Sequence, residues 1–85
     1  MKPVTYSRSA QKALQKIPRN IASLIVSKIN QYAADPASLA NNTKTLKGEF
    51  AGLVRLRVGD WRVIMDDRGN VLLIAEIKPR GGAYE

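Results

Sequence analysis

The order of apolar and polar side chains at the start of the chain predicts a short strand and a helix. Residues 2–6 alternate weakly and include valine, threonine and tyrosine, which suit a strand. Ser7 and Ser9 then offer alternative N-caps for a helix. The apolar residues of this helix recur at i, i+3, i+4 and i+7, and they are Ala10, Ala13, Leu14 and Ile17. One face of the helix is therefore expected to be buried.

A second helix is predicted directly after the first. Pro18 cannot continue the first helix, but proline suits the first turn of another. The helical spacing is repeated by Ile21, Leu24, Ile25, Ile29 and Tyr32. We expect this helix to stop at Asp35, because the residue before Pro36 is pushed out of the α region. Residues 36–45 are polar and aperiodic, so they predict an ordered surface connection.

From Val54 onwards the apolar positions follow the period of strands. They are Val54, Leu56 and Val58, then Trp61, Val63 and Met65. Between the two runs Gly59-Asp60 forms a plausible two-residue turn, which predicts a β-hairpin with one apolar face. A second turn at residues 67–70 precedes residues 71–77, which are apolar except for Glu76. This last run is typical of a strand that is buried on both faces.

Together these patterns predict an α+β fold with the order βααβββ. A chain of 85 residues has room for one hydrophobic core, so residues 1–85 are expected to form one domain. An antiparallel sheet buries one face under helices. We therefore expect sheet residues to pack against a helical stripe, the former being Leu56, Val63, Leu73 and Ile74 and the latter Leu14, Ile17, Ile25 and Ile29.

The composition restricts the chemistry that is open to the chain. It contains neither cysteine nor histidine, so thiolate and imidazole ligands and the usual general base are missing, and we expect no metal ion and no cofactor. Catalysis would depend on lysine, arginine, tyrosine and carboxylates. The N-terminus lacks the apolar core of a signal peptide, and no apolar run is long enough to span a bilayer, which predicts a cytosolic protein.

The charge is strongly positive and unevenly distributed. The formal net charge is +7, and all charged residues among the first 34 are basic, namely Lys2, Arg8, Lys12, Lys16, Arg19 and Lys28. Such asymmetry indicates a polyanionic partner, which could be the phosphate backbone of a nucleic acid, an acidic membrane or an acidic protein. The alternative is a basic surface that serves solubility alone.

The predicted hairpin brings arginines together on one face. With Gly59-Asp60 as the loop, Arg57 lies opposite Arg62 and Arg55 lies opposite Ile64. Directly opposed like charges cost stability, which an anionic ligand would offset. Alternatively, the arginines are solvated or paired with Glu49 or Asp66. The tail that follows adds two cations and an aromatic residue, Lys78, Arg80 and Tyr84, or it is a frayed terminus.

These residues resemble the RelE/ParE toxin superfamily. The resemblance lies in Leu46-Lys47-Gly48 and in the run from Val54 to Ile64, which are similar to that superfamily's signature. It extends to the opening strand, the two helices and the ending in which a basic pair precedes a tyrosine. The resemblance implies a RelE-like, microbial-RNase-type fold and a toxin of a type II toxin-antitoxin system. It also implies a RelB-like antitoxin as partner in a toxin-antitoxin hetero-oligomer.

The activity that the resemblance implies is ribosome-dependent cleavage of messenger RNA in the decoding site, which inhibits translation. The ribose 2′-hydroxyl attacks the adjacent phosphate, and the reaction needs a base, cations and a proton for the leaving oxygen. Arg55 and Arg62 would bind and stabilise the phosphate. Tyr84 is the best candidate for the base, because neighbouring cations favour its phenolate. Lys78 or Arg80 would complete the charge clamp or donate the proton.

Three further residues, Arg57, Lys47 and Lys44, are expected to bind RNA. The chain departs from many relatives, which carry histidine or a denser run of arginines in place of Lys78-Pro79-Arg80. Two other functions stay open. One is a ParE-like toxin that inhibits gyrase without ribonuclease chemistry, and the other is a basic nucleic-acid-binding module without activity.

Overall fold

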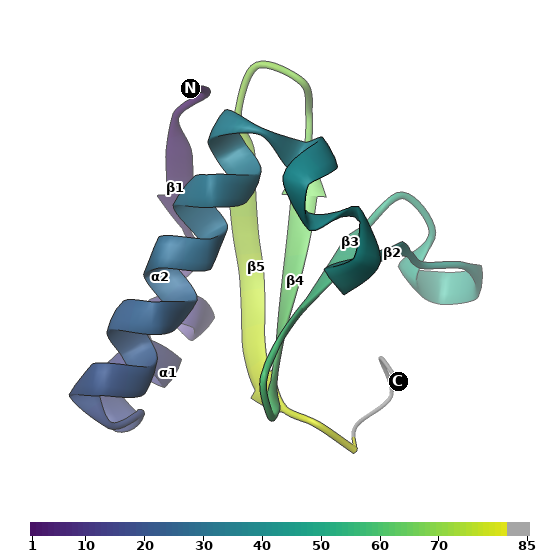
Figure 1. Ribbon diagram of the computed structural model, residues 1–85. Helices are drawn as coiled ribbons and strands as arrows, with labels where there is room; N and C mark the ends of the chain where they lie inside the picture. The colour runs from purple at the N-terminus through teal and green to yellow at the C-terminus, as the bar shows by residue number, and fades with distance from the viewer. Residues whose placement is uncertain (82–85) are drawn as a thin grey trace.

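The computed structural model describes residues 1–81, and its elements confirm an α+β fold (Figure 1). They follow in the order β1 (Val4–Tyr6), α1 (Arg8–Lys16), α2 (Arg19–Ala34), the 3₁₀ helix η1 (Pro36–Asn42), β2 (Thr43–Thr45), the 3₁₀ helix η2 (Gly48–Phe50), β3 (Val54–Val58), β4 (Trp61–Asp67) and β5 (Leu72–Pro79). The predicted sequence of a strand, two helices, a hairpin and a final strand is therefore present.

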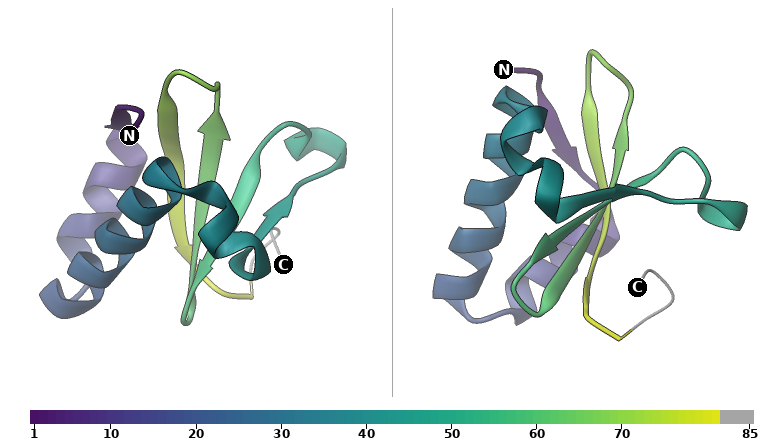
Figure 2. Two further views of the ribbon diagram at one scale, coloured as in Figure 1. Left: turned by 45° about the horizontal axis from the view of Figure 1, so that its top comes forward. Right: turned by 45° about the vertical axis from the view of Figure 1, so that its right-hand side comes forward.

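The five strands form one mixed sheet in the order β1-β5-β4-β3-β2. β1 pairs with β5 in parallel, whereas the other neighbours are antiparallel. The two helices connect β1 to the rest of the chain, and they lie together on one side of the sheet (Figure 2). We call the opposite side of the sheet the open face. Within residues 1–81 no helix is both long and apolar enough to pass through a membrane.

Capping residues set the limits of both helices. Ser7 is the N-cap of α1, and its Oγ accepts a hydrogen bond of 3.0 Å from the Ala10 amide. The same hydroxyl donates to the Ala75 carbonyl at 2.6 Å, so it also attaches the start of α1 to β5. Pro18 precedes the first residue of α2 as its N-cap, and Asp35 is the C-cap directly before Pro36. The predicted end of the second helix is thus confirmed.

Residues 36–45 contain more structure than the surface connection that the sequence predicted. The 3₁₀ helix η1 places Leu39 in the core with only 4% of its surface exposed. Thr43 and Lys44 then pair with Leu56 and Arg55 as part of β2. The edge of β3 needs partners for its backbone amides and carbonyls, and a short polar strand can supply them without any apolar alternation. This is why the pattern of side chains gave no sign of β2.

The core lies between the helices and one face of the sheet, largely as predicted. Six of the eight expected residues are buried there, namely Ile17, Ile25, Ile29, Leu56, Val63 and Ile74, and Leu14 packs against them half-buried. The prediction for Leu73 is wrong, since it lies on the open face opposite Thr5 and Asp66. Adjacent residues of a strand point to opposite faces, so Leu73 and Ile74 could not both face the helices.

The prediction that the last strand is buried on both faces is also wrong. In β5 the buried side chains are Leu72, Ile74 and Ile77, whereas Leu73 and Glu76 are half-buried. The strand is rich in apolar residues because it lies in the middle of the sheet, between β1 and β4. Its central position, rather than a second covering layer, accounts for the apolar run.

Candidate functional site

Five of the predicted site residues lie on the open face of the sheet. They are Lys44 on β2, Arg55 and Arg57 on β3, Arg62 on β4 and Lys78 on β5, and we call this group the cationic face. The pairing register places them there, because their strand neighbours Leu56, Val63 and Ile77 belong to the core on the other side. The hairpin register predicted from the Gly59-Asp60 turn is confirmed in full.

A row of three cations crosses the middle of the cationic face. Arg57 on β3 is paired with Arg62 on β4, and Arg62 is paired in turn with Lys78 on β5. Like charges that lie directly opposite each other destabilise a sheet, and here two such pairs are adjacent. A bound anion would remove much of this repulsion. The row therefore concentrates positive charge of the kind that attracts a phosphate.

A β-bulge brings Lys78 into this row. Ile64 pairs with Glu76 whereas Met65 pairs with Ile74, so Ala75 is an extra residue in β5. Without that residue, Lys78 would share the orientation of the core residue Ile74, because side chains two apart point to the same face. The bulge reverses the alternation and turns both Glu76 and Lys78 onto the open face.

Arg62 is buried although it belongs to the open face. Only 6% of its surface is exposed. Its Nη1 donates hydrogen bonds of 3.0 Å to the carbonyls of Gly59 and of Trp61. Gly59 adopts φ +57°, a conformation that glycine permits and that the tight turn between β3 and β4 requires. The turn therefore fixes the orientation of the guanidinium before any ligand arrives.

Arg55 has a buried side-chain donor that lacks a hydrogen-bond partner among the described residues. It lies between Lys44 on β2 and Ile64 on β4. The donor without a partner is its Nε. A buried donor without a partner costs about 1–3 kcal/mol, so a phosphate oxygen at this position would be stabilising.

Glu76 belongs to the site, although the sequence analysis did not select it. Its Oε1 lies 3.5 Å from Nζ of Lys78, and it is paired with Ile64 across β4. The available signal was that Glu76 is the one polar residue in an apolar run. Asp66 also lies on the open face, where it binds Nε of Arg68 at 3.0 Å rather than one of the three hairpin arginines.

The remaining predicted residues lie elsewhere. Arg80 follows β5 and is largely exposed; its amide donates to the Asp60 carbonyl at 2.8 Å, and its Nη1 lies 3.6 Å from the Asp60 carboxylate. Lys47 is exposed in the loop before η2. Tyr84 lies outside the described residues. Within residues 1–81, no group of three or more histidine, cysteine, aspartate or glutamate side chains is arranged to hold a metal ion.

A separate polar cluster joins the N-terminus to the end of β4. The Asp67 carboxylate accepts hydrogen bonds from Nζ of Lys2 at 2.8 Å and from the Tyr32 hydroxyl at 3.2 Å. The bond from Lys2 holds the pKa of Asp67 below its ordinary value, whereas burial and the neighbouring carboxylate raise the pKa of Tyr32. Burial likewise raises the pKa of Tyr6. All three groups lie away from the cationic face, and the two bonds to Asp67 join β4 to the N-terminus and to α2.

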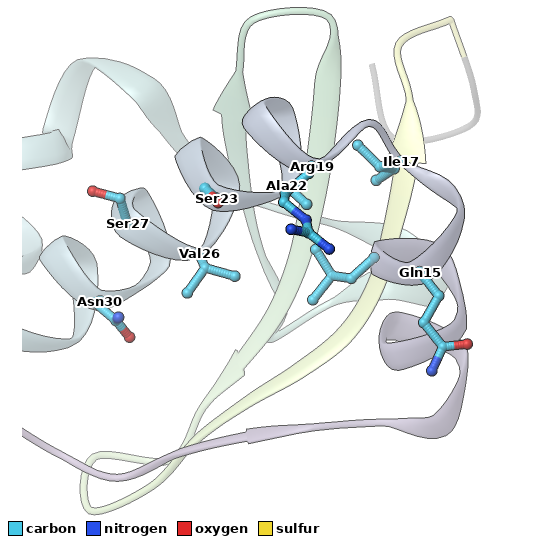
Figure 3. A pocket seen from close by; sticks show the side chains of 9 residues that line it. Gln15, Ile17, Arg19, Ala22, Ser23, Val26, Ser27 and Asn30 are labelled. Atoms are coloured by element: carbon cyan, nitrogen blue, oxygen red, sulfur yellow. The ribbon is translucent and has the colours of Figure 1, made fainter.

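The outer side of the helical pair carries a groove of about 830 Å³ (Figure 3). It is lined by Leu14, Gln15, Ile17, Arg19, Ala22, Ser23, Val26, Ser27 and Asn30. Figure 3 shows Ile17 and Gln15 on one side of it and Arg19, Ala22 and Val26 on the other. Apolar side chains with a few polar groups around them form the kind of groove that receives an amphipathic helix.

The model of one protein family matches almost the whole chain. It describes the ParE toxin of type II toxin-antitoxin systems, parDE, and it covers residues 4–84. The chain belongs to this family. This match confirms the resemblance to the RelE/ParE superfamily that the sequence of the toxin predicted. Among curated proteins there is no match.

Solved structures of similar toxins share its fold. The archaeal RelE–RelB complex from Pyrococcus horikoshii OT3 contains a chain that is 28% identical, with a TM-score of 0.76, and the match covers 96% of the toxin and 98% of that chain. A chain of the RelBE2 complex from Mycobacterium tuberculosis is 24% identical with a TM-score of 0.76, and the match covers 93% of the toxin and 98% of that chain. A chain of the heterotetrameric YoeB–YefM complex from Staphylococcus aureus is 18% identical with a TM-score of 0.75, and the match covers 92% of the toxin and 95% of that chain. The toxin therefore has the RelE-like fold.

Proposed function

We propose that this toxin is a ribosome-dependent endoribonuclease that cleaves messenger RNA and so inhibits translation. The observation that supports this most directly is the row of Arg57, Arg62 and Lys78 across the open face. Three cations in strand register repel one another, and an RNA phosphate bound among them would offset that repulsion. The 28% identity to an archaeal RelE chain agrees with this choice.

The proposed reaction is attack of a ribose 2′-hydroxyl on the adjacent phosphate. A base takes the hydroxyl proton while the new oxygen–phosphorus bond forms, and the bond to the 5′-oxygen breaks as that oxygen receives a proton. The cations would stabilise the extra negative charge on the phosphate in the transition state. They act in place of a metal ion, so the mechanism is independent of metals.

Arg62 and Arg55 are proposed to bind the phosphate, each for a different reason. The guanidinium of Arg62 is held in place by the Gly59 and Trp61 carbonyls, so binding costs it little side-chain freedom. Arg55 offers its buried Nε. Arg57, Lys44 and Lys47 are exposed and would hold the RNA backbone more loosely.

Tyr84 is proposed as the base, because cations close to a phenol favour its phenolate and the basic residues Lys78 and Arg80 precede it in the sequence. Lys78 or Arg80 is proposed to donate the proton or to complete the clamp. We favour Lys78, because it lies opposite Arg62 in the strand register and its Nζ is 3.5 Å from the Glu76 carboxylate. Arg80 is occupied by Asp60 at the end of the hairpin.

The partner of this toxin is proposed to be a small antitoxin in a hetero-oligomer. The similar structures include complexes of RelE with RelB and of YoeB with YefM. An amphipathic antitoxin segment would fit the groove between α1 and α2, or an acidic segment would cover the cationic face. The cytoplasm is the proposed location, since its target is the ribosome.

Inhibition of gyrase is the second candidate function, and the family description as a ParE toxin favours it. Two assays separate the candidates. A ribonuclease would stop translation by ribosomes and cut their messenger RNA, whereas a gyrase inhibitor would block supercoiling and leave the RNA intact. Supercoiling inhibition without cleavage on ribosomes carrying a range of codons would replace our proposal with the second function.

Single-turnover cleavage on programmed ribosomes tests the mechanism. Tyr84→Phe should lower the chemical rate by about 10²–10⁴-fold and leave ribosome binding nearly unchanged, as expected for loss of a general base. Arg62→Ala should lower the rate and also weaken attachment to RNA phosphate. Full cleavage by Tyr84→Phe would exclude tyrosine as the base, and Glu76→Gln would then test the carboxylate beside Lys78.

A further inference from the structure

We propose that helix α1 carries a second RNA-binding surface, distinct from the cationic face, that holds the phosphate backbone of folded RNA. It consists of Arg8, Lys12 and Lys16, which we call the α1 ridge. The inference rests on the proposed function, because it adds a second contact with the RNA environment in which the toxin would act. It concerns attachment and assigns no chemistry to the ridge.

The ridge follows from the spacing of its residues. Arg8, Lys12 and Lys16 are four residues apart, so they form one line along α1 with a separation of about 6 Å along the helix axis. All three side chains are exposed. They line a shallow hollow of about 550 Å³ together with Ser9 and Ala13. The result is an oblique row of cations beside a depression that has hydroxyl, guanidinium and ammonium donors at its border.

The ridge is electrostatically unfavourable for the isolated protein. Like charges at i and i+4 on a helix destabilise it, by roughly 0.2–0.5 kcal/mol for each pair. No acidic residue occurs among residues 1–34 to relieve the repulsion. Arg8 also occupies the first turn of α1, where the partial positive charge of the helix favours an acid and where none is present. Lys16 lies in the last turn, where the helix dipole favours a cation, so the two i, i+4 pairs and the position of Arg8 are the unfavourable features that an anion on this surface would relieve.

The ridge and the cationic face lie on opposite sides of the protein. α1 packs its inner side on the core through Ala10 and Ile17, and the ridge residues lie on the outer side of that helix. The cationic face lies beyond the sheet on the other side. A strand bound at the cationic face therefore does not reach the ridge, and the ridge must bind a different segment of RNA.

The chemistry of the ridge favours RNA over an acidic protein. A protein helix that docks in a groove needs apolar anchors, and the hollow offers no apolar side chain larger than that of Ala13. Such anchors lie instead in the groove between α1 and α2. A phosphate backbone needs cations and hydrogen-bond donors only, which is what the ridge provides. Folded RNA, such as that of the ribosome, presents fixed rows of phosphates to a rigid row of this kind.

The test compares two double variants that lose the same charge. Lys12→Gln/Lys16→Gln removes most of the ridge, and Arg19→Gln/Lys28→Gln removes two cations of α2 that belong to neither RNA surface. Glutamine keeps the length and the helix propensity of lysine, so both variants are expected to fold. The probes are a short double-stranded RNA and ribosomes programmed with a messenger RNA that carries a 2′-O-methyl group at the scissile position, which prevents cleavage. Binding is measured between about 50 and 200 mM salt, where phosphate contacts change affinity most visibly.

We expect the ridge variant to bind both probes roughly tenfold more weakly at the lower salt concentration. Its plot of log affinity against log salt should be less steep by about 2, since two phosphate contacts are lost. The control variant should resemble the parent protein. At saturating protein, the ridge variant should cleave a natural messenger RNA at the parent rate, because the ridge is remote from the reacting phosphate.

Three results would overturn the inference. Equal weakening in both variants would reduce the effect to net charge, and unchanged binding by the ridge variant would show that the ridge holds no phosphate. Weaker binding of the antitoxin with unchanged binding of RNA would identify the partner of the ridge as an acidic protein. If the parent binds double-stranded RNA through the ridge but cuts no messenger RNA, the ridge stands and the proposed ribonuclease function fails.

Discussion

Arg62 and Lys78 lie directly opposite each other across β4 and β5, although Lys78 is four residues after the core residue Ile74. The extra residue Ala75 accounts for this arrangement, because it reverses the alternation of β5 between the two positions. The Ala75 carbonyl accepts a hydrogen bond of 2.6 Å from the Ser7 hydroxyl. The N-cap of α1 thus contacts the irregular position that turns Lys78 towards Arg62.

Ser7→Ala should therefore destabilise the protein more than Ser9→Ala. The first substitution removes the side-chain cap of α1 and the bond to Ala75, and we expect it to lower the free energy of unfolding by about 1–2 kcal/mol. Ser9 is exposed and was the alternative cap in the sequence, so its loss should change stability by less than about 0.5 kcal/mol. Urea unfolding of both variants is the measurement, and equal stabilities would refute the role of Ser7.

Arg57→Thr should stabilise the fold and weaken the toxin. Removal of this exposed cation relieves the repulsion with Arg62, and threonine suits a strand, so the free energy of unfolding should rise by roughly 0.2–1 kcal/mol. Binding to programmed ribosomes should weaken, with a less steep dependence on salt. Thermal unfolding and ribosome binding are measured on the same preparation. A variant that is both less stable and fully active would contradict our account of the cation row.

Arg62→Ala should destabilise the protein as well as reduce its activity. Its Nη1 donates to two carbonyls of the hairpin turn, and we expect the loss of these bonds to cost roughly 1–3 kcal/mol. Arg55→Ala is the matched control, because it removes the same charge from the same face and no side-chain hydrogen bond of Arg55 is present among the described residues. Circular dichroism during heating should show a lower unfolding temperature for Arg62→Ala than for Arg55→Ala. Equal transitions would show that the turn does not hold the guanidinium.

Ile74→Ala and Leu73→Ala should separate the two faces of β5. Ile74 is fully buried against the helices, so its truncation should cost about 2–5 kcal/mol. Leu73 is half-buried on the open face, and its truncation should cost clearly less, about 1 kcal/mol. Chemical denaturation of both variants is sufficient. A larger loss for Leu73→Ala would restore the prediction that this leucine belongs to the core.

Stability should fall in acid because of Asp67, whose pKa is lowered in the folded protein, chiefly by the hydrogen bond from Lys2. A group with a lowered pKa stabilises the fold fully above its ordinary value, which is 3.8 here, and this contribution is lost as the pH falls through the folded pKa. Unfolding curves between about pH 2 and pH 6 should show this loss in the parent. In Asp67→Asn that part of the loss should disappear, together with some stability at neutral pH. If the variant loses as much stability in acid as the parent, other carboxylates are responsible for that loss.

The sequence alone determined the elements that depend on neighbouring residues. The start of α1 was limited to Ser7 or Ser9, and the end of α2 was predicted before Pro36, because caps and proline act on the backbone within a few positions. The pairing of Arg57 with Arg62 follows from a two-residue turn and the alternation of side chains. The common face of Arg55, Arg57 and Arg62 and the family resemblance could therefore be predicted from the sequence.

Only the tertiary structure decided which distant residues meet. The parallel pairing of β1 with β5 and the addition of β2 join segments that carry no local signal of their partners. The bulge at Ala75 decided the faces of Leu73, Glu76 and Lys78, since one extra residue reverses the alternation and leaves no mark in an apolar run. The burial of Arg62 likewise depends on how the turn folds back over its side chain, which is a matter of packing rather than of sequence spacing.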